Sequence, residues 1–289
     1  MLRMKHDWKW VLLLVGPALL LYSSMVWFPT ILGFYQSLFR WAGLKDKAFV
    51  FFDNYRYLFG NRIFRNSMWI TLKYTLINVP LQISTAYVIA YLLFSIEKGH
   101  RFFRFVFFIP VVLLTVAVGI SFSFLFSRAF GAFKPIASWL GLTYFDPLAN
   151  AKTALYAAIL ADWWKWLGTK IMLFYAGFQG LPQDVLEAAV IDGANKPNVF
   201  FRIIIPLTWP VITVVTTLLV IGSLKVFDLL FVMTGGGPNH ATDVITIHLI
   251  DTAFGEQNFG SGSAIAVIMF VLSLIVTLLL RKALQREHL

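Results

Sequence analysis

The chain has 289 residues, of which 59% are hydrophobic and 13% are charged. Soluble domains carry about 45–50% apolar and about 25% charged residues, so this composition excludes a disordered chain and an ordinary soluble domain. The net charge of +10 does not indicate nucleic-acid binding, because Lys and Arg collect in the loops of membrane proteins and here lie scattered between apolar blocks. No cysteine is present, which excludes disulfides and thiolate metal sites.

Six apolar blocks predict six transmembrane helices, since about 20 helical residues cross a bilayer core. The expected spans lie near residues 10–34, 67–94, 105–127, 153–178, 208–232 and 264–280. The first is too long for the apolar core of a signal peptide and lacks a cleavage pattern, so we expect it to be retained. The fold class is therefore all-α and polytopic.

The distribution of basic residues predicts the orientation of these spans. With both termini cytoplasmic, the inner segments contain 11 Lys and Arg in 57 residues, and the outer segments contain 9 in 88. Cytoplasmic loops carry the excess of basic residues, so both termini are expected inside. In the segment 234–238, three glycines followed by Pro238 cannot remain helical and should end the fifth span sharply on the outer side.

The longest inner segment, residues 179–207, has the pattern of two short helices. Pro182 suits the first turn of a helix, and Gly193 can adopt the left-handed conformation that closes one. A second helix is expected from about Pro197 to Ile204, stopped before Pro206. From the residues alone, the segment is either an amphipathic linker on the membrane surface or a docking element for another protein.

A resemblance to a known family favours docking. Glu187-Ala188-Ala189 and Asp192-Gly193-Ala194, followed by Phe200, Ile203, Pro206 and Pro210, resemble the EAA loop of binding-protein-dependent ABC importer permeases. In that family the loop is a coupling helix that docks on the ATP-hydrolysing subunit. The resemblance therefore implies an ATPase-coupling role for Glu187, Ala188, Ala189, Asp192 and Gly193.

Further matches are similar to MalF-like sugar permeases and extend over nearly the whole chain. They comprise Asn54-Tyr55 with Leu58-Phe59, Phe103-Arg104 with Phe108-Ile109-Pro110, Ala176-Gly177-Phe178-Gln179, and Phe227-Asp228 before the glycine segment. The resemblance implies a type I ABC importer permease fold in the cytoplasmic membrane of a prokaryote. Residues 1–66 would form an N-terminal helix and first outer loop, 67–281 a five-helix core containing the coupling loop 179–207, and 282–289 a cytoplasmic tail.

The resemblance also implies the partners of the chain. They are a second homologous permease subunit, two ATPase subunits, an extracytoplasmic solute-binding protein, a sugar substrate and membrane lipid. ATP and Mg would be bound by the ATPase subunits, because this chain has no Gly-x4-Gly-Lys-Ser/Thr phosphate loop. No cofactor, metal site or catalytic residue is expected in the chain itself.

Ionisable residues inside the expected spans, together with one neighbouring tryptophan, are candidates for the substrate path: Asp162, Lys165 and Trp166 in the fourth span, and Lys225 and Asp228 in the fifth. Such residues usually face the bundle interior or water, and polar groups beside tryptophan suit a carbohydrate. The spacing also allows ion pairs between Asp162 and Lys165 and between Lys225 and Asp228, as neighbours on one helix face. Each pair could instead neutralise itself at a helix contact, and the sequence leaves both alternatives open. Lys73 and Lys170 can snorkel and are assigned no role.

Two other functions remain possible from the sequence. One is a secondary transporter driven by an ion gradient, although no internal repeat is visible. The other is a polytopic membrane enzyme, which the absence of a catalytic constellation disfavours. His240 and His248 lie in an expected outer loop without a matching set of carboxylates, so we expect them to be solvated loop residues rather than metal ligands.

Overall fold

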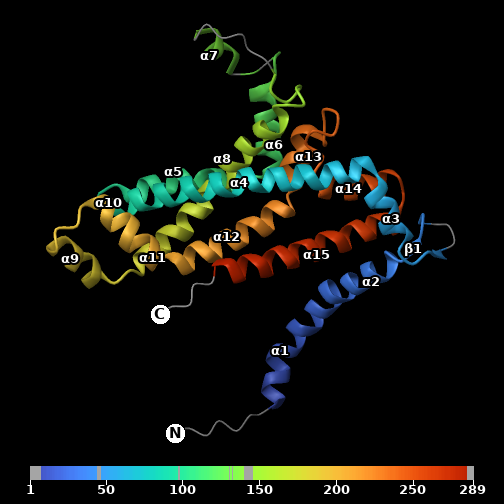
Figure 1. The fold of residues 1–289 in the computed structure, drawn as a ribbon, viewed down its shortest axis with the longest axis horizontal. Helices are drawn as coiled ribbons and strands as arrows, with labels where there is room; N and C mark the ends of the chain where they lie inside the picture. Colours follow the sequence, from blue (N-terminus) through green and yellow to red (C-terminus); the bar gives the residue numbers. More distant parts are fainter. Residues whose placement is uncertain are drawn as a thin grey trace. The chain divides into compact units, whose positions relative to one another are not determined.

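The computed structural model describes residues 8–43, 47–96, 98–129, 131, 133–139 and 146–284. The chain divides into two compact units, one formed by Met1–Asn61 with Leu249–Phe270 and the other by Arg62–His248 with Val271–Leu289. Helices dominate the described residues of both units, in agreement with the predicted all-α fold class (Figure 1).

The first unit begins with the predicted first span. Helix α1 (Trp8–Tyr22), π-helix η1 (Ser23–Trp27) and helix α2 (Phe28–Gln36) follow one another without a gap, so the predicted stretch is helical throughout. Strands β1 (Phe39–Arg40) and β2 (Ala48–Phe49) then pair antiparallel, and helix α3 (Asp53–Gly60) follows. The amide of Asn54 in α3 donates to the carbonyls of Ser37 (2.8 Å) and Phe39 (2.9 Å), which ties α3 to the chain after α2.

The same unit contains π-helix η3 (Asp251–Gly255) and the start of helix α15 (Phe259–Leu284). Gly260 in α15 lies against β1, and its N–H donates to Trp41 O at 3.2 Å. A Cβ at Gly260 would lie 2.0 Å from Phe39 O. Glycine is therefore required where α15 meets the strand.

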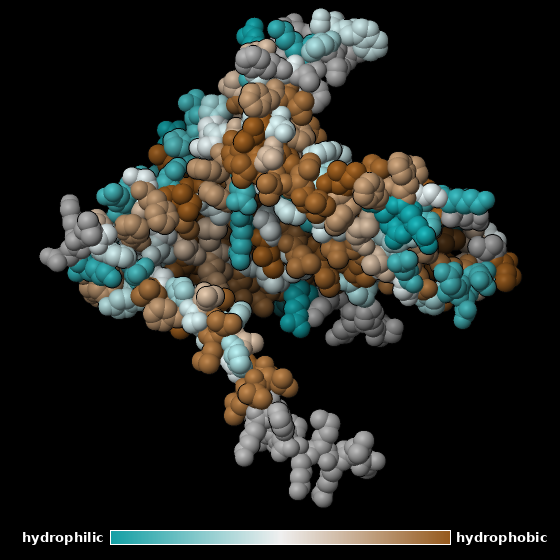
Figure 2. Space-filling view, turned by 180° about the vertical axis from the view of Figure 1, so that it is seen from behind, coloured by the Kyte–Doolittle hydropathy of each residue, from teal (hydrophilic) through white to brown (hydrophobic). Residues whose placement is uncertain are grey.

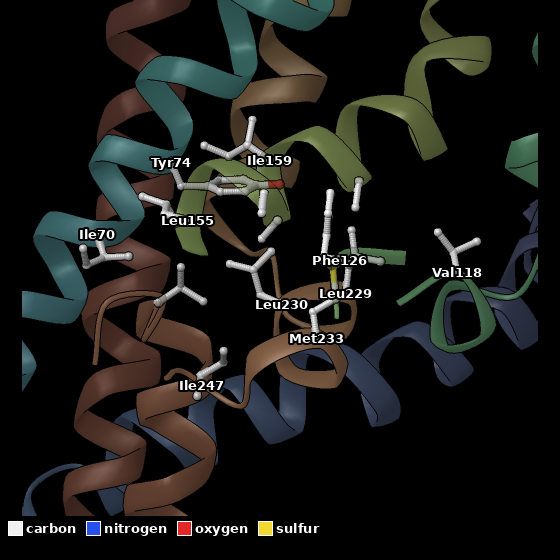
Figure 3. Packing of buried hydrophobic residues seen from close by; sticks show 14 residues of the cluster. Ile70, Tyr74, Val118, Phe126, Leu155, Ile159, Leu229, Leu230, Met233 and Ile247 are labelled. Atoms are coloured by element: carbon white, nitrogen blue, oxygen red, sulfur yellow. The ribbon is translucent and has the colours of Figure 1, made fainter. Parts of the chain in front are cut away.

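The second unit is built on two long helices, α4 (Arg62–Ser95) and α8 (Ala154–Gln179), which pack along each other. The residues of the predicted second and fourth spans therefore each form a single helix. Helix α5 (His100–Val112) packs on α8, and helix α12 (Trp209–Leu224) packs on α4. A hydrophobic cluster joins α4 and α8 to helix α13 (Asp228–Thr234), and Tyr74 reaches into it from α4 (Figure 3).

The predicted third span, 105–127, is not one continuous helix. Helix α5 ends at Val112, helix α6 (Thr115–Phe126) begins after two intervening residues, and the two helices meet at 93° (Figure 1). Leu113 and Leu114 are extended, with ψ of 145° and 132°. Pro110 lies inside α5, so the break falls after the proline, at two leucines that carry no helix-breaking signal. Beyond α6 lies the short helix α7 (Phe133–Trp139).

The predicted fifth span, 208–232, is also divided. Helix α12 ends at Leu224, and α13 is a separate helix that begins at Asp228. The predicted helix end at the glycine segment is confirmed, because α13 stops at Thr234 and both Gly235 and Gly236 have positive φ. The short helix α14 (Ile245–Ile250) follows this segment.

The segment before α12 is longer than expected. Helix α10 (Lys196–Val199), π-helix η2 (Phe200–Ile204) and helix α11 (Ile205–Leu207) form one run that meets α12 at 68°. The predicted stop before Pro206 is therefore wrong. Ile205 N–H donates to Phe200 O, five residues back, so the shift in hydrogen-bond register falls next to Pro206 and accommodates a residue without a donor.

Three described helical segments are long and apolar enough to cross a membrane: Leu12–Gln36, Arg62–Ser95 and Phe259–Leu284. The two bent pairs, α5 with α6 and α10–α11 with α12, raise this number to five. Helix α8 is absent from this set because Asp162, Lys165 and Lys170 interrupt its apolar sequence. Hydrophobic side chains nevertheless cover much of the surface seen in Figure 2, as in a protein surrounded by lipid.

Candidate transport cavity and coupling loop

A cavity of about 320 Å³ lies in the second unit, between α4, α8 and α12. Part of its polar lining comes from Tyr74, Asn78 and Gln82 on α4, Asp162 and Lys170 on α8, and Ser223 on α12. The three α4 residues follow one another at spacings of four and therefore share a helix face. This face is a polar stripe inside an apolar bundle.

The carboxylate of Asp162 is the central group of this lining. The residue is only 6% exposed, and its Oδ2 accepts hydrogen bonds from Asn78 Nδ2 (3.0 Å) and Gln82 Nε2 (3.1 Å). Asn78 Nδ2 also lies 3.2 Å from the Tyr74 hydroxyl and 3.4 Å from Ser223 Oγ. A buried charge is tolerated only when it is paired or hydrogen-bonded. Here the amides of a neighbouring helix supply those bonds.

Four of the five residues predicted for the substrate path line this cavity together: Asp162, Trp166, Lys225 and Asp228. Lys165 does not. Its Nζ instead donates to the carbonyls of the α5–α6 break, so the expected ion pair between Asp162 and Lys165 is not formed. The reason is that α8 directs neighbouring side chains toward different helices, Asp162 toward α4 and Lys165 toward α5.

Lys225 and Asp228 lie at the interruption between α12 and α13. Lys225 follows the last residue of α12, and Asp228 opens α13, so they are not successive turns of one helix as expected. Both are exposed within this chain and line the cavity. Phe227 between them also lines it and stacks on Phe231, with ring centroids 4.9 Å apart.

Several residues of the cavity were not predicted from the sequence. Lys170 follows Asp162 and Trp166 at spacings of eight and four, which places all three on one face of α8, and this periodicity could have identified it. The ammonium group of Lys170 lies 5.8 Å from the centre of the Trp166 ring. The polar stripe of α4 carries no charge, and charge at membrane depth was the signal on which the prediction rested.

The predicted coupling loop contains helix α9 (Gln183–Ile191). The predicted turn at Gly193 is confirmed, because its φ is +78° and no atom lies within 4 Å of the position of a Cβ. Ala194 N–H donates to Ala189 O at 3.0 Å, five residues back. This bond is typical of a helix closed by a left-handed glycine.

The coupling residues differ in their exposure. Glu187, Ala188 and Asp192 are exposed, whereas Ala189 is 8% exposed and faces its own chain. Ile191, at the end of α9, is 84% exposed. The surface available to another protein is therefore acidic and apolar. Below it, Leu181 and Leu186 pack with a hydrophobic cluster of α4 and α8, which seats the loop on the second unit.

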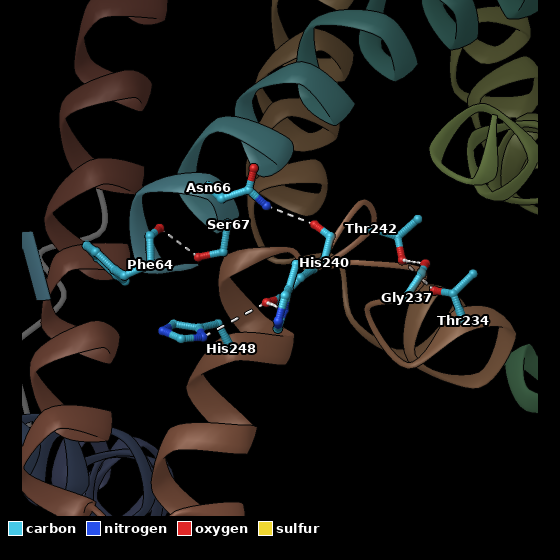
Figure 4. A network of polar contacts seen from close by, with 9 residues as sticks. Phe64, Asn66, Ser67, Thr234, Gly237, His240, Thr242 and His248 are labelled. Carbon is cyan, nitrogen blue, oxygen red and sulfur yellow. Dashed lines mark hydrogen bonds and ion pairs between the residues drawn. The ribbon is translucent and has the colours of Figure 1, made fainter. Parts of the chain in front are cut away.

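A second polar network joins α4 to the segment after the glycines (Figure 4). Asn66 donates to the carbonyl of His240 at 2.8 Å, and Thr71 Oγ1 accepts from the N–H of Ile245 at 2.9 Å. His240 Nδ1 lies 2.9 Å, and His248 Nδ1 4.0 Å, from Asp243 Oδ2. The expectation of solvated histidines is wrong for His248, which is 7% exposed because α14 turns it inward.

Comparison with known proteins identifies the family. The family model for "Binding-protein-dependent transport system inner membrane component" matches residues 82–287, which is more than half of the chain. The chain belongs to this family. The resemblance found in the sequence is thereby confirmed, and the family member is a multi-pass membrane protein.

Two relatives align with this chain over almost its entire length. The chain is 33% identical to the multiple sugar-binding transport system permease protein MsmF of Streptococcus mutans, over 94% of this chain and 93% of the relative. It is 32% identical to the trehalose/maltose transport system permease protein MalF of Thermococcus litoralis, over 93% of this chain and 92% of the relative.

Solved structures establish the fold. A bacterial ABC transporter involved in the import of the acidic polysaccharide alginate has a chain that superposes with a TM-score of 0.88 at 19% identity, covering 99% of this chain and 98% of that one. A structure of a bacterial alginate ABC transporter with its pentasaccharide-bound periplasmic protein gives 0.85 at 18% identity, over 96% and 94%. The family member therefore has the predicted type I ABC importer permease fold.

Proposed function

We propose that this chain is a permease subunit of an ATP-driven importer that carries a sugar or oligosaccharide through the cavity between α4, α8 and α12. The observation that carries the proposal is the convergence of Asp162, Lys170 and the α4 amides beside the Trp166 ring inside an apolar bundle. Carboxylate, amide and ammonium groups hydrogen-bond hydroxyls, and an indole ring offers an apolar face to a sugar ring. The names of MsmF and MalF support a sugar as the substrate class.

The proposed topology has six spans with both termini in the cytoplasm. Helix α8 is the span that hydropathy alone misses. Its 26 residues are long enough to cross the bilayer, and the buried charges of Asp162 and Lys165 find their hydrogen-bond partners within the protein. In this arrangement residues 67–281 form the five-helix core, 1–66 the N-terminal helix with the first outer loop, and 282–289 the cytoplasmic tail.

The proposed complex contains a second homologous permease, two ATPase subunits and an extracytoplasmic solute-binding protein in the cytoplasmic membrane of a prokaryote. The binding protein delivers the sugar, and the ATPases bind ATP and Mg and supply the energy. Support for a binding protein comes from the alginate transporter with its periplasmic protein and from the family itself. Loop 179–207 transmits the motion of the ATPases, so that the bundle alternates between two states.

The experiment that tests this function is uptake by reconstituted vesicles. The assembled importer with its binding protein should accumulate sugar when ATP is present and no ion gradient is imposed. A secondary transporter, the alternative function, would give the opposite pattern, with uptake driven by the gradient and unaffected by ATP.

Trp166→Ala tests the role of the cavity. Loss of the indole removes the apolar face beside Lys170, so uptake should fall at least about tenfold, which corresponds to about 1.4 kcal/mol of lost interaction. Complex yield and ATP hydrolysis should stay near the values of the unmodified importer, because the Trp166 side chain is only half-buried. Measuring yield, hydrolysis and uptake on one preparation checks this, and a parallel loss of all three would make Trp166 a packing residue.

Glu187→Lys tests the coupling loop. Glu187 is exposed on α9 beside the apolar Ala188, and we expect its carboxylate to bind a basic residue of the ATPase. Charge-assisted bonds contribute about 1.5–3 kcal/mol each, so reversing the charge should reduce recovery of the ATPase with the permease about tenfold or more. A charge reversal in the ATPase should restore part of it. Glu256→Lys, at an exposed position outside the loop, is the control; equal recovery with both variants would exclude the role.

A further inference from the structure

Lys165 is a buried ammonium group that the sugar path does not use. It lies in the middle of α8 and is 1% exposed. Its Nζ donates to three backbone carbonyls, those of Pro110 (3.3 Å), Val111 (3.2 Å) and Leu113 (2.5 Å). These carbonyls belong to the end of α5 and to the extended residue that follows it.

The ammonium group of Lys165 matches the carbonyls at the end of α5 in number and in charge. A helix end leaves its last carbonyls without intrahelical partners, and it carries partial negative charge. The 93° bend between α5 and α6 leaves such an end beside α8, in a stretch expected to cross the membrane, where lipid cannot supply donors. An ammonium group has three N–H donors and no acceptor. The Lys165 ammonium group thus supplies hydrogen-bond donors to the free carbonyls at the end of α5. The same carbonyls stabilise a charge that would be costly at membrane depth.

The bend is joined directly to the cavity. Thr115, the first residue of α6, lines the cavity. On α8, Trp166 follows Lys165, and the Lys165 Nζ lies 4.7 Å from the centre of the Trp166 ring. The group that fixes the bend therefore also contacts the aromatic wall of the cavity.

We propose that Lys165 is a positioning residue, which holds the bend between α5 and α6 and thereby places Thr115 and the Trp166 ring in the cavity wall. Its importance for sugar import rests on the proposed function, but its effect on the cavity wall can be measured without transport. Without the ammonium group, α5 and α6 lose the charge that keeps them bent, and the opening residue of α6 moves.

The absence of cysteine from the chain allows a direct test. Thr115→Cys introduces a single thiol. The assembled complex is labelled with a hydrophilic maleimide, and the rate of labelling is measured on the gel band of this subunit. Adding Lys165→Met should change this rate at least fivefold, whereas Lys165→Arg should keep it near the parent rate. Lys73→Met is the matched control, because Lys73 is a lysine of a membrane helix that contacts the Tyr156 ring rather than the bend.

A second neutral variant, Lys165→Gln, serves in case Lys165→Met does not fold, because the glutamine amide can still donate to one or two of the carbonyls. The proposal requires that Lys165→Gln assemble at near-normal yield and show a changed labelling rate with reduced sugar uptake. It is overturned if labelling of the introduced thiol is unchanged in both neutral variants, or if both simply fail to assemble, since Lys165 would then be needed for stability alone. Changed labelling in an importer whose unmodified form carries no sugar would uphold the positioning role and refute the proposed function.

Discussion

Gly168→Val is expected to abolish recovery of the folded permease. Gly168 lies where α8 meets α5, and a Cβ there would sit 2.1 Å from Phe107 O and 2.9 Å from Phe107 C. Both atoms belong to the backbone and cannot move aside without separating the helices. Overpacking of a well-packed core costs about 1–3 kcal/mol and sometimes more, and a clash this close should lie at the upper end. The yield of assembled complex and its thermal unfolding midpoint measure the effect.

The control for this substitution is Gly222→Val. Gly222 also lies in a membrane helix, α12, but no atom is within 4 Å of the position of its Cβ. Its yield should stay within about twofold of the unmodified complex. Recovery of the Gly168→Val complex at the same level would show that α5 and α8 do not pack as described.

Gly193→Val is expected to uncouple ATP hydrolysis from transport. Gly193 has a φ of +78° in open space, so the substitution acts through the backbone rather than through contacts. The left-handed conformation costs an L-residue roughly 1–2 kcal/mol, and a β-branched side chain adds to this. The turn after α9 should therefore open, and uptake should fall at least about tenfold while hydrolysis by the assembled complex continues.

Gly193→Asn separates this explanation from a loss of contact. Asparagine tolerates the left-handed conformation, so it should restore most of the uptake lost with valine, although it is larger than glycine. The ratio of sugar transported to ATP hydrolysed is the quantity to compare. Equal uptake with valine and with glycine would contradict the proposed role of the turn.

The sequence predicted the helix ends that fall at glycine, but not the helix breaks that fall elsewhere. The end of α13 at Thr234 and the turn at Gly193 both follow from the conformational freedom of glycine. The break at Leu113 has no such signal, because leucine favours helices. The bend there depends on Lys165, which lies more than 50 residues away in the sequence and becomes a neighbour only through the packing of α5 on α8.

The candidate site was predicted only in part, again because contacts between helices cannot be inferred from the sequence of one helix. Charges at membrane depth predicted Asp162, Lys225 and Asp228, and the aromatic ring beside them predicted Trp166; these four residues line one cavity. Spacing along one helix suggested ion pairs, yet Asp162 is satisfied by amides on another helix. Helical periodicity describes the neighbours within a helix. The partners across helices depend on which faces meet, and the sequence of a single chain does not specify that.

The most direct test of the central claim, that sugar passes through the cavity between α4, α8 and α12, is a structure of the assembled importer with sugar inside the membrane. The complex would contain the second permease and hydrolysis-deficient ATPases, and would be trapped with ATP after delivery by the binding protein. We expect sugar density in the cavity, against the Trp166 ring and within hydrogen-bond distance of Asp162 or Lys170. Sugar bound in the membrane part at a place that contacts none of these three residues would contradict the account.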